Sequence, residues 1–141
     1  MKILRPIASL VVLLASPVMT GCMHHGSVRS VTETDNGTTI ALGRHDVLEV
    51  ILPGNPSTGY SWQTVQLNSW VLAPLRRPVF TPPSASTGTN DTPRVGAGGS
   101  FRMTYEVVGA GTSPLELSYT RPWEPETNPN QTFKITVNVA K

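Results

Sequence analysis

"FRMTYEVV", residues 101–108, alternates apolar and polar side chains at every step. A strand with this pattern turns one face to a core and the other to water, because successive side chains point to opposite sides of a sheet. The inward face would hold Phe101, Met103, Tyr105 and Val107. TFKITVNV at 132–139 repeats the pattern, and LELSY at 115–119 repeats it in a shorter form. These three segments predict half-buried strands of an antiparallel sheet.

The rest of the chain also favours strands over helices. No window of a dozen residues has helical spacing, and 13 prolines and 12 glycines interrupt the chain. Further strands are expected at 38–42, 46–52, 60–67 and about 71–75, with a short one at 78–81. We therefore predict an all-β fold, an immunoglobulin-like antiparallel β-sandwich or barrel of seven or eight strands. The expected core is Leu48, Val50, Trp62, Phe101, Met103, Tyr105, Leu117, Phe133, Ile135 and Val137. The sequence does not decide the position of Trp70, which lies in a polar connection and could cover one end of the barrel.

The first part of the chain has the pattern of a secretory signal. A short basic start precedes an apolar run at 7–18, and small residues close it. The run is shorter than the ~20 residues that a membrane-spanning helix needs. VMTGC at 18–22 resembles the lipobox of bacterial lipoproteins, which implies acylation of Cys22, although Met19 stands where leucine is preferred. A conventional signal, cleaved or uncleaved, is the alternative.

These features predict three parts of the chain. Residues 1–21 would be a lipoprotein signal peptide, 22–36 a flexible tether, and 37–141 the folded domain. The protein would be held in the bacterial cell envelope by lipid on Cys22, in the outer membrane because no aspartate follows that cysteine. Since Cys22 is the only cysteine, no disulfide forms within the chain.

Charge and ligand types exclude several functions. Residues 1–21 contain two of the 11 basic residues and no acid, so the remainder carries 11 − 2 = 9 basic and 9 acidic residues. A formally neutral chain after residue 21, without a basic patch, argues against nucleic acid or an anionic membrane surface as its partner. His24 and His25 lack a nearby third ligand, so neither a metal nor a cofactor is expected. The protein is expected to be a monomer.

Three unusual segments connect the predicted strands. They are NPSTG at 55–59, the long stretch 76–99 that ends in GAGG, and TRPWEPETNPN at 120–130. Alternate connections of an up-and-down antiparallel chain fall at the same end of the molecule. The three segments should therefore lie side by side, as binding loops do in antibody variable domains.

Each segment has a binding interpretation and a structural one. Pro56 would stiffen the first loop and Gly59 would let it bend, giving a narrow polar wedge, or the segment is a proline turn capped by Asn55. The glycine-rich stretch 96–99 would run extended along a partner backbone, or it is a hinge. Trp123, between Arg121 and Glu124, would be an exposed interface residue, or it folds back over the end of the domain.

The three motifs together resemble those of the chagasin-type inhibitors of papain-like cysteine peptidases. That resemblance covers about residues 38–140 and implies a reversible protein inhibitor whose three loops occlude the catalytic cleft, with Thr58 near the catalytic residues of the peptidase. The residues implied to bind the peptidase are Asn55, Pro56, Ser57, Thr58, Gly59, Tyr60, Gly96, Ala97, Gly98, Gly99, Arg121, Pro122 and Trp123.

Two other function classes compete with an inhibitor. An enzyme would need Ser57 near His45, but a seven-residue extended strand between them spans more than about 20 Å, so we expect no enzyme. A carbohydrate-binding or adhesive envelope lipoprotein would use Trp70 and Trp123 as sugar platforms. It gives no reason for NPSTG and GAGG to share one end of the fold.

Overall fold

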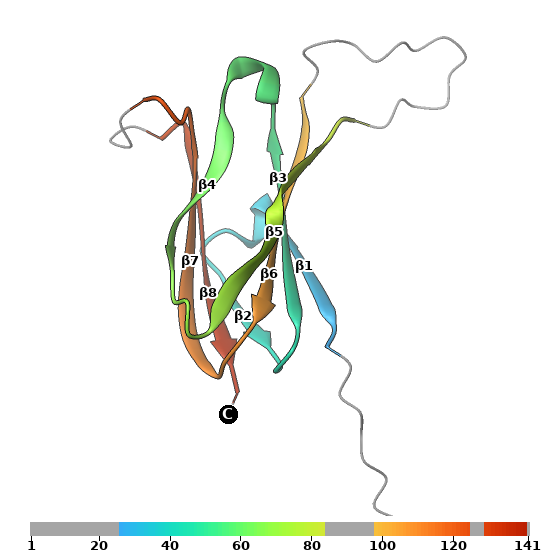
Figure 1. The fold of residues 1–141 in the computed structure, drawn as a ribbon, viewed down its shortest axis with the longest axis vertical. Helices are drawn as coiled ribbons and strands as arrows, with labels where there is room; N and C mark the ends of the chain where they lie inside the picture. The colour runs from blue at the N-terminus through green and yellow to red at the C-terminus, as the bar shows by residue number, and fades with distance from the viewer. Residues whose placement is uncertain (1–25, 84–97, 125–128, 141) are drawn as a thin grey trace, which may run out of the picture.

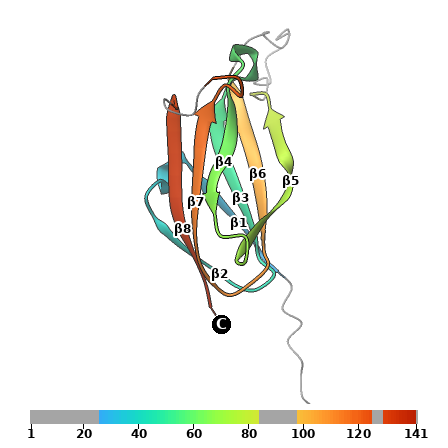
Figure 2. The same ribbon diagram turned by 60° about the vertical axis from the view of Figure 1, so that its left-hand side comes forward.

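Two four-stranded sheets pack face to face in the structure, a computed structural model that describes residues 26–83, 98–124 and 129–140 (Figures 1 and 2). The strands are β1 (Val28–Thr32), β2 (Thr39–Leu42), β3 (Val47–Gly54), β4 (Ser61–Leu67), β5 (Leu72–Thr81), β6 (Gly99–Val107), β7 (Gly111–Thr120) and β8 (Gln131–Val139). Two single turns of 3₁₀ helix, η1 (Glu33–Asp35) and η2 (Pro56–Thr58), complete the elements. The prediction of an all-β sandwich of seven or eight strands is confirmed.

Strand order makes both sheets mixed rather than purely antiparallel. One sheet has the order β1-β3-β6-β5 and the other β2-β8-β7-β4. The edge pairs β1–β3 and β2–β8 are parallel, whereas the other pairs are antiparallel. β1 and β3 run the same way because the chain crosses to the other sheet for β2 between them. The antiparallel prediction therefore fails for these two edge pairs and holds for the other four pairs.

The core follows the alternation seen in the sequence. All ten residues predicted to be buried are no more than 6% exposed, and they come from both sheets. Phe101 on β6 lies edge-on to Tyr119 on β7 with ring centroids 6.3 Å apart, so aromatic contacts link the two sheets. Trp70 does not cover an end of the core, since it is 85% exposed.

The tether predicted for residues 22–36 is wrong where the structure describes it. Val28–Thr32 forms β1, which pairs with β3 from Val28↔Val47 to Thr32↔Ile51. Val31 is fully buried, and Asp35 accepts a hydrogen bond from the Thr32 N–H at 2.8 Å. A strand with one inward apolar residue has no period-two signal, so only its pairing partner reveals it. The predicted signal peptide and Cys22 lie outside the described residues.

β5 joins two segments that the sequence separates. The predicted strands at 71–75 and 78–81 are one edge strand whose pairing with β6 shifts register twice. Pro74 and Pro78 interrupt it, and proline cannot donate to a sheet ladder, which explains both the irregular pairing and the edge position.

The β3–β4, β5–β6 and β7–β8 connections leave the sandwich at one end (top of Figure 1). The register of the strands places Gly54 opposite Gly99 and Ser61 opposite Thr120 at this end. The β2–β3, β4–β5 and β6–β7 turns lie at the other end, where the first described residues also begin. No helix within the described part of the chain is long and apolar enough to span a membrane.

Candidate functional site

The β3–β4 connection is a rigid hump rather than a loose loop. Asn55 is extended and caps η2, with its side-chain Oδ1 accepting a hydrogen bond from the Ser57 N–H at 3.1 Å. Pro56 starts the turn, where its missing N–H costs nothing. Gly59 closes it in the left-handed region with φ of 80°. The predicted Asx cap and the predicted stiff wedge are therefore the same structure.

Both hydroxyls of the hump donate inside it. Ser57 Oγ donates to Asn55 Oδ1 at 2.6 Å, and Thr58 Oγ1 donates to the Asn55 carbonyl at 2.6 Å. A hydroxyl has one hydrogen and two lone pairs, so each retains only acceptor capacity for a partner. The side chains of Ser57 and Thr58 thus stiffen the hump, and their hydroxyls can form further hydrogen bonds only as acceptors.

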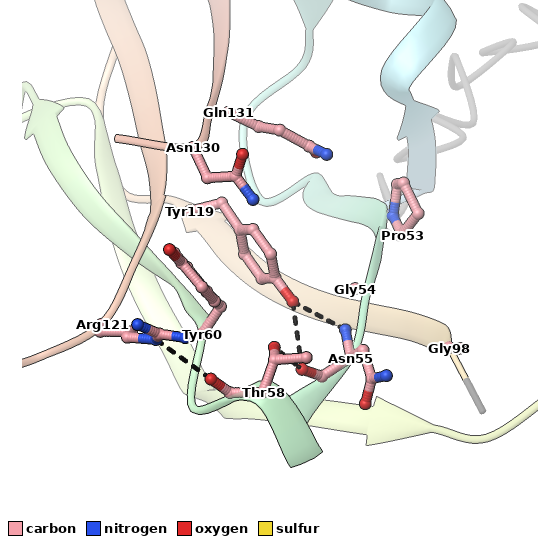
Figure 3. Close-up of a pocket in the computed structure, with 11 residues that line it drawn as sticks. Pro53, Gly54, Asn55, Thr58, Tyr60, Gly98, Tyr119, Arg121, Asn130 and Gln131 are labelled. Atoms are coloured by element: carbon pink, nitrogen blue, oxygen red, sulfur yellow. Dashed lines mark hydrogen bonds between the residues drawn. The ribbon is translucent and has the colours of Figure 1, made fainter. Parts of the chain in front are cut away.

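Tyr119 on β7 connects the hump to the core. Its hydroxyl accepts from the Asn55 N–H at 2.7 Å and lies 3.3 Å from the Asn55 carbonyl, to which it donates (Figure 3). Its ring stacks on Tyr60 with centroids 5.3 Å apart and also contacts Trp62. Tyr119 is 5% exposed, so a buried side chain sets where the hump stands. The sequence predicted a strand at 115–119 that ends in Tyr119 but did not indicate this role.

Arg121 ties the β7–β8 connection to the hump. Its Nε donates to the Thr58 carbonyl at 3.1 Å, and its guanidinium carbon lies 4.5 Å from the centre of the Tyr60 ring (Figure 3). Its Nη1 pairs with Glu124 at 2.8 Å. The hydrogen bond to Glu124 raises the pKa of Arg121 above its ordinary value, so the guanidinium stays charged. Arg121 therefore holds two segments 63 residues apart.

Trp123 lies over Gly59. A Cβ at position 59 would come within 2.6 Å of the indole Cη2, so a side chain there would push the indole away. The indole is nevertheless 71% exposed. Trp123 is thus not folded over the end of the core. It rests on the hump and offers most of its surface to solvent.

The start of β6 lies at the foot of the hump. Gly99 pairs with Gly54, and a Cβ on Gly99 would collide with the Thr81 carbonyl and the Phe80 ring. Gly96 and Ala97 lie outside the described residues, so only half of the predicted GAGG site is placed. A recess of about 570 Å³ opens between the three connections (Figure 3). Its lining residues are Pro53, Gly54, Asn55, Thr58, Tyr60, Gly98, Gly99, Tyr119, Arg121, Asn130 and Gln131.

The arrangement has no catalytic or metal-binding constellation in the residues that the structure describes. His45 precedes β3 and Ser57 follows it, so they lie at opposite ends of the sandwich. No group of three His, Cys, Asp or Glu side chains converges anywhere in residues 26–83, 98–124 and 129–140. His24 and His25 fall outside these ranges.

The geometry of three neighbouring connections agrees with the family comparison. A family model described as chagasin family peptidase inhibitor matches residues 42–137. The chain belongs to the chagasin family. This family consists of peptidase inhibitors, so the expectation that the chain is not an enzyme is confirmed.

Relatives of this chagasin-family chain match over most of their length. Amoebiasin-1 of Entamoeba histolytica is 33% identical over 111 residues, which is 78% of this chain and 98% of the relative. The crystal structure of the cysteine protease inhibitor EhICP2 from the same organism has a TM-score of 0.67 at 22% identity, covering 82% of this chain and 98% of that one. The structure of PbICP-C in complex with falcipain-2 has a TM-score of 0.51 at 21% identity, covering 82% and 100%.

The chagasin-family motifs are brought together as the sequence predicted wherever they are described. Asn55 to Tyr60 form the hump, Arg121 and Trp123 contact it, and Gly98 and Gly99 approach its foot. Sequence reasoning missed Glu124 as the ion-pair partner of Arg121, and Gly54, whose Cβ would meet the Phe101 ring at 2.6 Å. The spacing of Arg121 and Glu124 was the one available signal.

Proposed function

We propose that this chain reversibly inhibits papain-like cysteine peptidases by filling the catalytic cleft with three neighbouring loops. The family supports inhibition of peptidases. Structural relatives named as a cysteine protease inhibitor and as a complex with falcipain-2 support the class of target. The observation that carries the proposal is the contact between Trp123 and Gly59, which joins two loops into a single projecting surface.

Inhibition by this surface needs shape and no covalent chemistry. The hump is narrow, internally hydrogen-bonded and held by Tyr119, so little conformational freedom is lost when it enters a cleft. It offers hydroxyl and carbonyl acceptors where a substrate would offer its scissile bond. The indole of Trp123 supplies the largest exposed apolar area beside it, and tryptophan is frequent among residues that dominate interfaces.

The proposed contact set is the one implied by the family motifs. It comprises Asn55, Pro56, Ser57, Thr58, Gly59, Tyr60, Gly96, Ala97, Gly98, Gly99, Arg121, Pro122 and Trp123. Within it, Arg121 and Tyr60 have internal partners, so they act chiefly by holding the loops in place.

Titration of the purified protein against papain tests the proposal. We expect reversible inhibition at nanomolar to sub-micromolar concentration, that is about 8 to 12 kcal/mol of binding free energy. Trypsin and thermolysin serve as controls and should be unaffected. Unchanged papain progress curves at about 10 μM protein would contradict the proposal, because that concentration is on the scale of weak complexes.

A sugar-binding function is less consistent with the positions of the exposed tryptophans. Trp123 contacts Gly59 at the loop end, whereas Trp70 lies in the β4–β5 turn at the opposite end. The two indoles therefore cannot form one platform.

We propose further that lipid on Cys22 holds the protein in the bacterial cell envelope, in the outer membrane. The support is the apolar run at 7–18 followed by VMTGC. Palmitate labelling of the full-length protein in a bacterial host should mark the wild type and be lost in Cys22→Ser. Sequencing of the mature N-terminus should start at residue 22. Inhibition of papain by Cys22→Ser should be unchanged, because the thiol takes no part in the proposed mechanism.

A further inference from the structure

The end of the sandwich opposite the inhibitory loops carries two exposed apolar side chains on touching turns. Trp70, in the β4–β5 turn, is 85% exposed, and Val108, in the β6–β7 turn, is 51% exposed. The Val108 N–H donates to the Val71 carbonyl at 2.9 Å, which fastens one turn to the other. We call Trp70 and Val108 the basal patch.

The turn that carries Trp70 is tightly held. Asn68 Oδ1 accepts from the Trp70 N–H at 3.1 Å, and the Asn68 carbonyl accepts from the Val71 N–H at 3.0 Å. The Asn68 N–H in turn donates to Ser113 Oγ, and its side-chain amide donates to the Thr112 carbonyl. These bonds fix the backbone with the indole outward. Its exposure is thus a property of the fold and not of a loose segment.

The chain enters the domain at this same end. The Ser27 carbonyl accepts from the Val47 N–H at 2.8 Å, and the Ser27 N–H donates to the Asp46 carboxylate at 2.8 Å. The Asp46 carbonyl accepts from the Val107 N–H at 2.9 Å. Ser27 is therefore connected through Asp46 and Val107 to the turn that bears Val108.

The position of Cys22 limits how far this end can stand from a membrane. Four residue steps separate Cys22 from Gly26, and a chain reaches at most about 3.5 Å per residue, so the span is no more than about 14 Å along any path. If lipid holds Cys22 at a bilayer, Gly26 at the basal end therefore lies within about 14 Å of Cys22 at the headgroups.

The charges around the patch are balanced. Arg44 is exposed in the neighbouring β2–β3 turn, and Glu106 is exposed near the end of β6. Attraction to anionic lipid is therefore not the driving force, in agreement with the balanced charge of residues 22–141. Tryptophan is instead enriched at membrane–water interfaces, where its ring lies at headgroup level with its apolar surface removed from water.

We propose that the basal patch rests on the phospholipid bilayer that holds Cys22, with Trp70 inserted at the headgroup boundary. The inhibitory loops then face away from the membrane, towards peptidases in the surrounding space. This inference rests on the proposed lipid attachment at Cys22. It assigns a function to an exposed tryptophan that the inhibitory site does not use.

Fluorescence quenching tests the orientation in the mature, processed protein. The protein is isolated from a bacterial host and reconstituted into phosphatidylcholine vesicles whose acyl chains carry bromine, which quenches nearby indoles. We expect emission to be quenched relative to unbrominated vesicles, with about half or more of that quenching lost in Trp70→Ala. Trp123→Ala is the matched control, since Trp123 is similarly exposed at the other end, and it should retain the quenching.

Other outcomes would overturn the inference. If the protein floats with the vesicles but its indole emission is not quenched, the domain does not touch the bilayer. If the quenching is lost in Trp123→Ala instead, the loop end and not the basal patch faces the membrane. If the protein does not float, no lipid brings it to the membrane and the inference fails, whereas papain inhibition in the same sample still reports the proposed function separately. Shielding of Trp70 from acrylamide in native membranes but not in protein-free vesicles would assign the patch to a protein partner instead.

Discussion

Arg121 donates from Nε to the backbone carbonyl of Thr58 over 3.1 Å, and its guanidinium lies over the Tyr60 ring. Because the acceptor is a backbone carbonyl, the link does not depend on which side chain occupies position 58. It does depend on the planar guanidinium of arginine, which can donate to the Thr58 carbonyl and stack on the Tyr60 ring at the same time. Arg121 therefore helps to fix the β7–β8 connection relative to the hump.

Arg121→Lys should weaken papain inhibition while preserving charge. Lysine cannot both reach the Thr58 carbonyl and stack on Tyr60, so we expect the inhibition constant to rise about tenfold with an unchanged melting temperature. Arg102→Lys is the control, because Arg102 also pairs with a carboxylate, Glu49 at 3.1 Å, but on the face of a sheet. Equal inhibition by wild type and Arg121→Lys would show that the loops keep their positions without this residue.

Comparing Gly59→Ala with Gly37→Ala should separate the effect of backbone strain from the effect of the contact between Gly59 and Trp123. Gly59 and Gly37 both have φ of 80°, but Gly37 has nothing within 4 Å of its Cβ position, whereas Gly59 has the Trp123 indole. Each alanine should lower the free energy of unfolding by about 1 kcal/mol. Only Gly59→Ala should also raise the papain inhibition constant, by about tenfold or more, since its methyl displaces the indole. A similar inhibition constant for both variants would mean that Trp123 does not need its place on Gly59.

Tyr119→Phe should loosen the hump. It removes the hydroxyl that accepts from the Asn55 N–H, at a cost of about 1 kcal/mol in unfolding free energy. Tyr105→Phe is the matched control, because the buried Tyr105 hydroxyl also forms a hydrogen bond, with Thr64 Oγ1 at 2.8 Å. That bond does not involve the loops. We expect both to destabilise similarly in urea unfolding, and only Tyr119→Phe to weaken inhibition, by about three- to tenfold. Weaker inhibition by Tyr105→Phe as well would indicate a general effect of stability.

Trp123→Ala should cost the most binding energy. An exposed indole at the centre of an interface contributes about 2–4 kcal/mol on truncation, which isothermal calorimetry with papain would measure. The melting temperature should not change, because the side chain is 71% exposed. Trp70→Ala should leave inhibition intact. A fall of several degrees in melting temperature with undiminished inhibition would instead make Trp123 a cover for the domain.

Val31→Ala should reveal the structural role of β1. Val31 is fully buried, so the truncation leaves a cavity and should lower unfolding free energy by about 2 kcal/mol. Val28→Ala, in the same strand but 65% exposed, should change it by less than about 0.5 kcal/mol. Equal denaturation midpoints for the two variants would mean that residues 28–32 do not stabilise the domain, as expected for a tether.

The hump at Asn55–Gly59 shows how much of the structure local sequence can predict. Asn55, Pro56 and Gly59 act within a few residues of one another, through a cap, a fixed φ and a left-handed turn, so their conformation could be predicted from the sequence. The polar side chains of Ser57 and Thr58 were part of the predicted wedge, but both hydroxyls donate within the hump. Short-range hydrogen bonds compete for such hydroxyls, and the sequence alone does not say which partner wins.

The sequence by itself determined the strands with inward alternation and the turn at Asn55–Gly59, because these depend on local periodicity and local backbone preference. The tertiary structure alone decided that β1 is a strand, that Tyr119 supports the hump and that Trp123 lies on Gly59. It also decided that Trp70 faces outward beside Val108, at the end where the chain enters. Each of these is a contact between segments distant in the sequence, and such contacts arise only when the two sheets pack.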